Sequence, residues 1–371
     1  MSGRLAINGK FTSQRVTGVQ RVAEHLVRAL DARPGAEGVV LLVPPNGRRL
    51  GLVRIREQVV GPAGLPLHFW EQCVLPRAAR GALLLNLAGG APAWGGRQVS
   101  LLHDAAVFDR PEAYTPLFGL WYRWLFRRLA RRAVALLTVS RFSQLRLCAH
   151  LGLPEAAITV LRNGSDHLDR LRADRPHDPS ALAASLARWG LAPGSYLLAV
   201  GSANPNKNLA RLRQAHARLP VGAPALVMVG GSDTAVFADA QHLGAGDSSE
   251  GVRQLGPVDD EDLLTLYCGA AALVFPSTYE GFGLPPLEAM ASGCAVVASR
   301  AAAVVEVCGD AALYVDPLNV EEIADALLRV AMDQGLRDGL VVAGRARAAQ
   351  FRWQDAAHTL AGVLARCGVL V

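Results

Sequence analysis

The sequence has little of several features that mark common protein classes. Only 19% of its 371 residues are charged and 51% are hydrophobic, which excludes a disordered chain. No apolar run reaches the roughly 18–20 residues that span a bilayer, and the N-terminus lacks a signal-peptide core. The six cysteines form no Cys-x-x-Cys pair, so we expect reduced thiols in a cytosolic protein. No Gly-x-Gly-x-x-Gly follows the first predicted strand, which argues against a dinucleotide-dependent oxidoreductase.

Lysine is also scarce, and charge is unevenly distributed. Lys10 and Lys207 are the only lysines among 38 basic residues. Residues 1–170 carry 23 basic and 11 acidic side chains, a net charge of +12, whereas residues 171–371 carry 15 and 21, a net charge of −6. This asymmetry indicates that the two halves face different partners. We expect no nucleic acid among them, because no recognition module accompanies the charge.

Short apolar strands alternate with longer amphipathic helices, a pattern typical of a parallel sheet covered on both faces. Because a chain of this length exceeds a single core, we predict two Rossmann-like α/β domains. The predicted strands are Arg4–Asn8, Gly38–Pro44, Leu83–Leu87, Val99–His103, Ala135–Val139, Tyr196–Gly201, Ala225–Val229, Ala272–Phe275, Ala295–Ala298 and Ala312–Val315. The predicted helices include Gly18–Leu30, Leu117–Arg132, Ser140–Leu151, Leu209–Leu219, Val320–Asp333 and Gln354–Cys367.

The domain boundaries follow from a change of pattern. Around residues 166–193 the alternation loosens, which predicts a connector over 171–195. The first domain then covers 1–170 and the second covers 196–353. A C-terminal helix at about 354–371 could return to the first domain.

Ligands of open α/β sheets bind beyond the carboxyl ends of the strands, so the residues that follow each strand are the first candidates for a binding site. His103 and Asp104 follow one strand; they are either a helix cap beside a buried histidine or a cleft histidine that donates to a substrate hydroxyl. Lys207 precedes a predicted helix, where a lysine suits contact with phosphate but could also be a solvated loop residue.

The most specific pattern is the segment from Ala272 to Gly293. A buried strand leads into a loop with Glu280, Gly281 and Gly283, and a helix with Glu288 near its start follows. The glycines allow backbone N–H groups to converge on an anion or on sugar hydroxyls. Two carboxylates eight residues apart could hold two hydroxyl-bearing parts of one ligand, although acidic residues also favour helix N-termini for electrostatic reasons alone.

These residues resemble the nucleotide-sugar site of glycosyltransferase family 4, in which Glu280 and Glu288 match a Glu-x₇-Glu motif. The resemblance covers nearly the whole chain and is strongest to the mannosyltransferase-B-like branch. It implies the GT-B fold, with two Rossmann-like domains facing across a central cleft. It also implies a retaining glycosyltransferase that moves a sugar from a nucleotide diphosphate to a hydroxyl in bacterial surface polysaccharide synthesis, without a bound cofactor.

The resemblance assigns roles to individual residues. Glu288 would bind the ribose hydroxyls, Glu280 the donor sugar, Lys207 the diphosphate, and His103 the sugar from the opposite domain. The positions implied to surround the donor also include Gly281, Phe282, Gly283, Leu284, Val258 and Ser202. Those implied on the acceptor side are Gly18, Val19 and Arg21.

One departure from the family pattern concerns charge. The family usually has a second cation near the lysine, where this chain has Ser202 and Asn206. Because electrostatic stabilisation of a leaving diphosphate is a large catalytic factor, its loss puts the rate in doubt unless Arg162 or another arginine substitutes. Front-face substitution, in which the departing phosphate oxygen takes the acceptor proton, is the expected route.

Three alternatives remain at this stage. Asp260 and Asp262 have the spacing with which other glycosyltransferases hold a divalent cation, although acidic capping of a helix explains them better, and no metal is expected. A nucleotide-sugar epimerase of similar build is the second enzyme hypothesis. A nucleotide-sugar-binding protein with little turnover is the third.

The partners follow from the same interpretation. GDP-mannose is the favoured donor, with UDP-sugars as the alternative, and a glycan or lipid-linked oligosaccharide is the expected acceptor. Residues 117–132 carry five arginines among aromatic side chains, so this helix either covers the sheet or lies on the inner face of the cell membrane. We therefore expect a cytoplasmic protein, with peripheral membrane contact as the open question.

Overall fold

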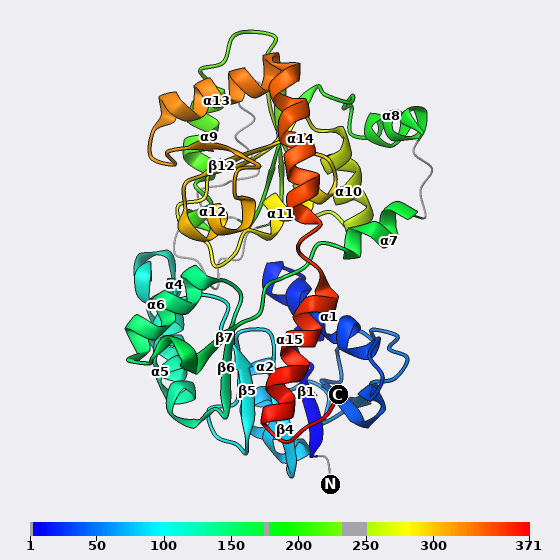
Figure 1. The fold of residues 1–371 in the computed structure, drawn as a ribbon, viewed down its shortest axis with the longest axis vertical. Helices are drawn as coiled ribbons and strands as arrows, with labels where there is room; N and C mark the ends of the chain where they lie inside the picture. The colour runs from blue at the N-terminus through cyan, green and yellow to red at the C-terminus, as the bar shows by residue number, and fades with distance from the viewer. Residues whose placement is uncertain (1–2, 174–177, 203, 232–250) are drawn as a thin grey trace. The chain divides into compact units, whose positions relative to one another are not determined.

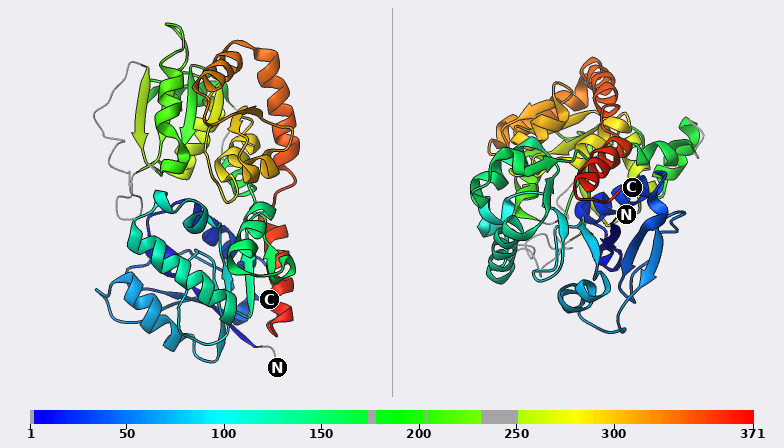
Figure 2. Two further views of the ribbon diagram at one scale, coloured as in Figure 1. Left: turned by 90° about the vertical axis from the view of Figure 1, so that its left-hand side faces the viewer. Right: turned by 60° about the horizontal axis from the view of Figure 1, so that its bottom comes forward.

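The computed structural model describes residues 3–173, 178–202, 204–231 and 251–371. The chain divides into two compact units, each built around its own sheet (Figure 1). Unit 1 comprises Met1–Asp109, Gly119–Gly164 and Arg352–Val371, and unit 2 comprises Arg110–Phe118 and Ser165–Phe351. All strand pairings within both sheets are parallel, and helices lie on both faces (Figure 2), as expected for Rossmann-like units.

The sheet of unit 1 has seven strands in the order β3-β2-β1-β4-β5-β6-β7. Its strands are β1 (Arg4–Asn8), β2 (Val39–Val43), β3 (Arg56–Val59), β4 (Ala82–Asn86), β5 (Gln98–Leu101), β6 (Ala135–Thr138) and β7 (Ile158–Val160). The five central strands agree with the prediction. The two edge strands were missed, because β3 is polar and exposed and β7 has only three residues, so neither forms an apolar run.

The C-terminal helix belongs to unit 1, as the prediction of a returning helix anticipated. The α-helices of this unit are α1 (Gly18–Asp31), α2 (Leu67–Phe69), α3 (Leu75–Ala78), α4 (Ala106–Asp109), α5 (Pro116–Arg132, from Gly119 onward), α6 (Arg141–Leu151) and α15 (Trp353–Arg366). The rings of His25 on α1 and Trp353 on α15 lie 5.2 Å apart. The backbone N–H of Gly3 also donates to Gly368 O at 2.9 Å, which holds the two ends of unit 1 together.

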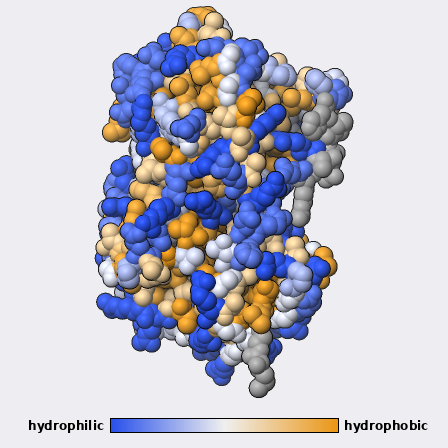
Figure 3. All heavy atoms as spheres, viewed as in Figure 1, coloured by the Kyte–Doolittle hydropathy of each residue, from blue (hydrophilic) through white to orange (hydrophobic). Residues whose placement is uncertain are grey.

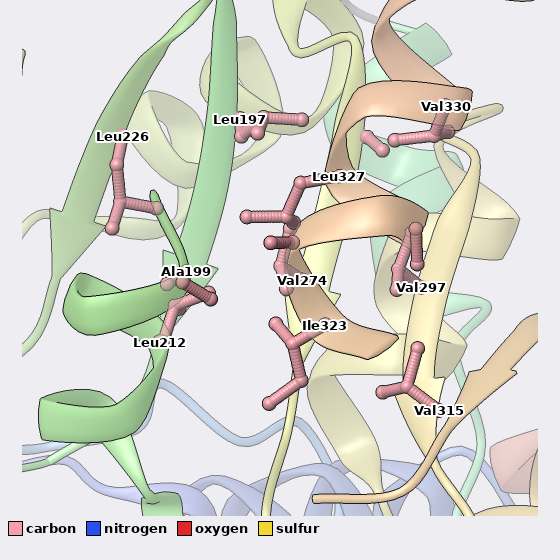
Figure 4. Close-up of a cluster of buried hydrophobic side chains, with 14 of the residues drawn as sticks. Leu197, Ala199, Leu212, Leu226, Val274, Val297, Val315, Ile323, Leu327 and Val330 are labelled. Carbon is pink, nitrogen blue, oxygen red and sulfur yellow. The ribbon is translucent and has the colours of Figure 1, made fainter. Parts of the chain in front are cut away.

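The sheet of unit 2 has six strands in the order β10-β9-β8-β11-β12-β13. Its strands are β8 (Tyr196–Val200), β9 (Ala225–Val229), β10 (Val252–Gly256), β11 (Ala272–Phe275), β12 (Val296–Ser299) and β13 (Leu313–Val315). Only the edge strand β10 was missed; its residues are exposed or half-buried, and none is fully buried. Apolar residues of the inner strands pack against α9 and α13 around Val274, Val297 and Leu327 (Figure 4).

The predicted connector contains helices rather than an extended linker. The helices of unit 2 are α7 (His167–Ala173), α8 (Pro179–Ala187), α9 (Leu209–His216), α10 (Asp260–Gly269), α11 (Leu284–Ala291), α12 (Ala302–Cys308), α13 (Val320–Met332) and α14 (Gln334–Ala348). Two of these, α7 and α8, occupy most of the segment where the sequence pattern loosened. Asp178 caps α8 by accepting from Ser180 N at 2.9 Å, a local signal that the sequence does contain.

In the described ranges, no helix is both long enough and apolar enough to cross a membrane. On the face drawn in Figure 3, hydrophobic and hydrophilic residues are interspersed. Isolated apolar residues of this kind are normal for a folded surface.

Candidate active site

The chain order in the sheet of unit 2 reverses at β8, which has β9 on one side and β11 on the other. Such a reversal separates the loops that follow the two central strands and opens a crevice at their carboxyl ends. Here those loops are the segment after β8, which leads to Lys207, and the segment after β11, which leads to Glu280. The sequence-predicted donor residues therefore lie at the position where α/β sheets usually bind ligands.

Lys207 and Glu280 form an ion pair across these two loops. Lys207 Nζ donates to Glu280 Oε1 at 2.7 Å, and the two side chains are 17% and 14% exposed. The ammonium also lies 5.0 Å from the ring centre of Phe275, the last residue of β11. An ion pair this shielded from water is stronger than a surface pair, yet its partial exposure leaves it open to a ligand.

The loop that carries Lys207 is fixed by its asparagines. Asn204 Oδ1 accepts from Asn206 N at 2.9 Å and starts a 3-10 turn over Pro205–Lys207. Asn208 adopts the left-handed backbone conformation with φ 58° and donates from Nδ2 to Pro276 O at 3.1 Å. Thr278 N donates to Asn206 O at 2.8 Å, so the two loops are hydrogen-bonded to each other. Lys207 is thus held in place by backbone contacts rather than by its own side chain alone.

The glycine loop after β11 leads directly into α11. Gly283 has φ 118°, a conformation that favours glycine, and Leu284 begins the helix with prolines in its first turn. Gly281 is buried, and Phe282 packs its ring against Phe351 at 6.0 Å. Since the Phe282 side chain serves the core, any ligand contact of this loop would come from its backbone N–H groups, which suits an anion at a helix N-terminus.

Glu288 is more enclosed than its predicted role requires. Its side chain is 3% exposed, Oε2 accepts from the Tyr267 hydroxyl at 3.1 Å, and Oε1 lies 3.4 Å from His167 Nε2. His167 opens α7 and Tyr267 lies in α10, so the carboxylate links three helices. Neither partner could be identified from the sequence, because both come from segments far from the motif. The ribose contact of Glu288 remains a prediction.

The other positions that the resemblance implies at the donor, or at the usual second cation, are Ser202, Asn206 and Val258. Ser202 is half-buried just after β8, and Asn206 is buried at 4% exposure, so the usual places of a second cation hold neutral side chains. Val258 is half-buried between β10 and α10. The acidic run that follows caps α10, because Asp259 Oδ1 accepts from Asp262 N at 2.8 Å, and Asp262 pairs with Arg188.

His103 follows β5 in unit 1 and is held by the backbone. Its Nε2 lies 2.9 Å from Leu87 O, and because a carbonyl can only accept, Nε2 carries the proton. Burial lowers the pKa of His103 to about 4, so the ring is neutral at neutral pH and Nδ1 is an acceptor. The expected donor to a substrate hydroxyl would therefore accept from that hydroxyl. Asp104 accepts from Ala106 N at 2.8 Å and caps α4, as the simpler interpretation held.

The residues predicted to face the acceptor lie in the first turn of α1. Gly18 is exposed, and Val19 and Arg21 are half-buried. Thr17 precedes the helix and its N–H donates to Gln20 Oε1 at 3.2 Å, which fixes the turn. Gln20 Nε2 in turn donates to Gln14 Oε1 at 3.3 Å.

A second lysine–glutamate pair lies in unit 1, and it was not predicted from the sequence. Lys10 Nζ donates to Glu71 Oε2 at 2.7 Å, with the two side chains 13% and 3% exposed. The rarity of lysine was the signal that could have identified Lys10, since Lys207 was selected on the same grounds. Glu71 lies in an irregular helical segment with no recognisable motif.

Comparison with known proteins agrees with this geometry. Residues 194–333 match the family model described as glycosyl transferases group 1, and residues 16–167 match the model described as glycosyltransferase family 4. O-antigen chain mannosyltransferase B of Escherichia coli is 33% identical over 267 residues, which are 70% of this chain and 68% of that protein. O-antigen chain mannosyltransferase RfbU of Salmonella typhimurium is 26% identical over 242 residues, which cover 62% of this chain and 63% of that protein.

A third relative and two solved structures extend the comparison. The MMP alpha-(1->4)-mannosyltransferase of Mycolicibacterium hassiacum is 32% identical over 261 residues, 66% of this chain and 58% of that protein. Anabaena Alr3699/HepE in complex with UDP-glucose superposes with a TM-score of 0.74 at 18% identity, over 99% of this chain and all of that one. WaaG, a glycosyltransferase involved in lipopolysaccharide biosynthesis, gives 0.72 at 16% identity, over 97% and 99%. The two sheets, the family models and these relatives agree: the chain belongs to glycosyltransferase family 4 and has the GT-B fold.

Proposed function

We propose that the protein transfers mannose from GDP-mannose to a hydroxyl of a glycan or lipid-linked acceptor in bacterial surface polysaccharide synthesis. The observation that carries the proposal is the Lys207–Glu280 pair at the carboxyl ends of β8 and β11, followed by a glycine loop and a helix N-terminus. A cation, converging N–H groups and a carboxylate together complement a diphosphate joined to a sugar.

The residues of unit 2 divide the donor among them. Lys207 would neutralise the diphosphate, because an ammonium has three N–H donors and Glu280 accepts one of them. Glu280 would accept from a sugar hydroxyl while it keeps the ammonium oriented. Gly281, Phe282, Gly283 and Leu284 would offer backbone N–H groups at the start of α11, with Ser202 beside them. Glu288 would reach the ribose and Val258 the base.

The reaction is proposed to retain configuration at the anomeric carbon, without a metal ion. In front-face substitution the bond from the anomeric carbon to the phosphate oxygen breaks while the acceptor oxygen bonds to the same face. The departing phosphate oxygen takes the acceptor proton, so no side-chain base is required. Catalysis would then rest on positioning and on charge stabilisation by Lys207, with His103 as an acceptor for a sugar hydroxyl.

Mannose is favoured over other sugars on the strength of the relatives. Three of them carry mannosyltransferase in their names, and two of these concern O-antigen chains. The structural neighbour Alr3699/HepE was solved with UDP-glucose, so a UDP-sugar is the main competing donor. An acceptor from surface polysaccharide also suits the net charge of +12 over residues 1–170, since lipid-linked acceptors are anionic.

A donor screen followed by product analysis tests the proposal. Stabilisation against heat by GDP, UDP, dTDP and ADP is compared first, because ligand binding raises the melting temperature by mass action. Products from GDP-mannose are then analysed with and without acceptor. We expect GDP to stabilise most and a glycoside to form only with acceptor. A new nucleotide sugar formed without acceptor would indicate an epimerase, and binding with no product would indicate a protein without turnover.

We also propose peripheral membrane contact through α5. Positions 120, 124, 127 and 131 recur at helical spacing and are all exposed, and they carry Leu120, Trp124, Arg127 and Arg131. The opposite side of the helix is core, with Leu125, Phe126 and Leu129 buried. A helix that presents apolar and aromatic residues beside arginines suits an anionic lipid interface. This arrangement supports a location at the inner face of the cell membrane.

A further inference from the structure

The two lysines of the chain occupy equivalent places in the two sheets. Lys10 follows β1, at which the strand order of unit 1 reverses, as Lys207 follows β8 in unit 2. Each lysine lies in a short 3-10 turn, and each donates to a shielded glutamate at 2.7 Å. Because the unit 2 pair is proposed to face a ligand, the unit 1 pair is a second candidate for a ligand site.

An unusual backbone presents Glu71 to Lys10. Residues Trp70–Val74 form a π-helical turn between α2 and α3, a conformation that is rare and frequent at functional sites. Trp70 is 1% exposed and its Nε1 donates to Val60 O at 2.8 Å, which anchors the turn. A Cβ on Gly90 would lie 2.8 Å from Glu71 Oε1, so the loop after β4 approaches the carboxylate closely.

A network of buried polar side chains supports the Lys10–Glu71 pair. Asn8 Nδ2 donates to Glu71 Oε1 at 3.2 Å and to Asn86 Oδ1 at 3.0 Å, and Asn86 donates onward to Gln98 and Ser100. This network spans the three neighbouring strands β1, β4 and β5. A buried ion pair contributes little net stability, since desolvation offsets its attraction. The network is therefore better explained as holding the Lys10 and Glu71 side chains in place for a ligand.

The pair opens into a small polar pocket on unit 1. Its walls include Asn8, Lys10, Gln14, Glu71 and Tyr122, and its interior has room for about one water-sized group. Burial and the Glu71 carboxylate raise the pKa of Tyr122, so its hydroxyl stays protonated. The pocket thus offers an acidic acceptor, an ammonium donor and a phenol within a space for a single hydroxyl.

We propose that this pocket binds one hydroxyl of the acceptor saccharide and selects the acceptor by it. A hydroxyl can donate to Glu71 and accept from Lys10 at once. A phosphate or carboxylate would be repelled by Glu71, and an amine by Lys10. The proposal rests on the proposed glycosyltransferase function and adds a specificity-determining site to it.

The pocket is assigned to the acceptor rather than to the donor because of its neighbours. Gln14 on its wall accepts from Gln20, which fixes the first turn of α1, where Gly18, Val19 and Arg21 lie. The donor groups, in contrast, are concentrated around Lys207 and Glu280 in unit 2. A variant that loses acceptor binding but keeps donor binding would therefore support the acceptor assignment over the donor assignment.

The test measures binding of methyl glycosides of mannose, glucose, galactose and N-acetylglucosamine by saturation-transfer NMR, with monodeoxy analogues of whichever binds best. The variants are Lys10→Met with Glu71→Gln, and separately Tyr122→Phe and Gln14→Ala, which leave the buried pair intact if the double variant fails to fold. Glu37→Gln with Arg54→Met, an exposed pair of unit 1, is the matched control. GDP binding is measured for every variant.

We expect one deoxy position to weaken wild-type binding roughly 10- to 100-fold, the effect of leaving charged partners without a hydrogen bond. The double variant should bind the parent glycoside as weakly as the wild type binds that deoxy analogue, and the same deoxygenation should not weaken its binding further. Tyr122→Phe and Gln14→Ala should each weaken binding of the parent glycoside roughly 3- to 10-fold. GDP binding and the control should be unchanged. Wild-type-like glycoside binding by the folded variants, no binding of any glycoside to the wild type, or a loss confined to GDP would overturn the inference. Absence of sugar transfer with intact glycoside binding would instead count against the proposed function alone.

Discussion

The ammonium of Lys207 donates to Glu280 Oε1 at 2.7 Å, between the loops that follow β8 and β11. Each side chain holds the other in place: the carboxylate keeps the ammonium beside the glycine loop, and the ammonium fixes the position of the carboxylate. A ligand that brings both a diphosphate and hydroxyls can engage the two together. This relationship is the basis for the first prediction.

Replacing Lys207 with methionine removes the one lysine of unit 2 while keeping the length of the side chain. We expect the rate of transfer from GDP-mannose to fall by about 10²–10³, because loss of one charge-stabilising donor has that effect in other enzymes. GDP affinity should fall as well. Steady-state kinetics and calorimetry of GDP binding measure the two effects. Arg300→Met, which breaks the exposed Arg300–Glu322 pair, is the control and should alter neither; equal rates for both variants would contradict the role of Lys207.

The second prediction concerns the buried carboxylate of Glu288. Tyr267→Phe removes the hydroxyl that donates to it at 3.1 Å and should lower the free energy of unfolding by about 1–3 kcal/mol. Tyr314→Phe is the comparison, because Tyr314 donates to a neutral acceptor, Gly309 O, at 2.6 Å. Hydrogen bonds to charged groups are the stronger ones, so Tyr267→Phe should lower the melting temperature more. A larger loss in Tyr314→Phe would count against a charged Glu288 at this position.

The third prediction is a pH dependence at His103. Burial holds its pKa at about 4 in the folded protein, below the ordinary value of 6.5 in the unfolded chain. Between these values the unfolded chain binds more protons, so the free energy of unfolding falls as pH drops from 6.5 towards 4. His103→Gln should lack this component. The difference in melting temperature between wild type and variant should therefore be smaller at pH 5 than at pH 7.5. An unchanged difference would show that His103 is not kept neutral by the fold.

The fourth prediction concerns membrane contact through α5. Arg127→Glu with Arg131→Glu reverses two exposed charges of that helix and should abolish binding to vesicles containing anionic lipid. Arg188→Glu with Arg300→Glu makes the same change in net charge on exposed arginines of unit 2 and should leave binding intact. Co-sedimentation with phosphatidylglycerol vesicles provides the measurement. If vesicle binding persists in the variant with Arg127→Glu and Arg131→Glu, α5 is a helix that only covers its sheet.

The fold could be predicted where burial imposes a pattern. Inner strands such as β1, β9 and β11 are covered on both faces, so their apolar runs marked them to the residue. The edge strands β3 and β10 have exposed or half-buried side chains, and pairing rather than composition defines them. The return of a C-terminal helix to the first domain was predicted, but its contacts, such as the packing of Trp353 on His25, depend on residues more than 300 positions apart.

The candidate site was predictable to the extent that its residues follow strands. Glu280 and Lys207 each lie just beyond a recognisable strand, and parallel strands bring such residues to one edge. Glu71 could not be found this way, because it reaches Lys10 from a π-helical turn that no local pattern marks. His167 and Tyr267 were missed for the same reason: they meet Glu288 only through the packing of three helices.

GDP binding and acceptor-dependent GDP release, measured side by side for the wild type and Glu280→Gln, give the sharpest test of the role of Glu280. The variant keeps the shape of the side chain and removes the charge that orients Lys207. We predict that it binds GDP with an affinity close to that of the wild type and releases GDP from GDP-mannose at least about 100-fold more slowly. Full turnover by Glu280→Gln, with nucleotide affinity intact, would contradict the central claim.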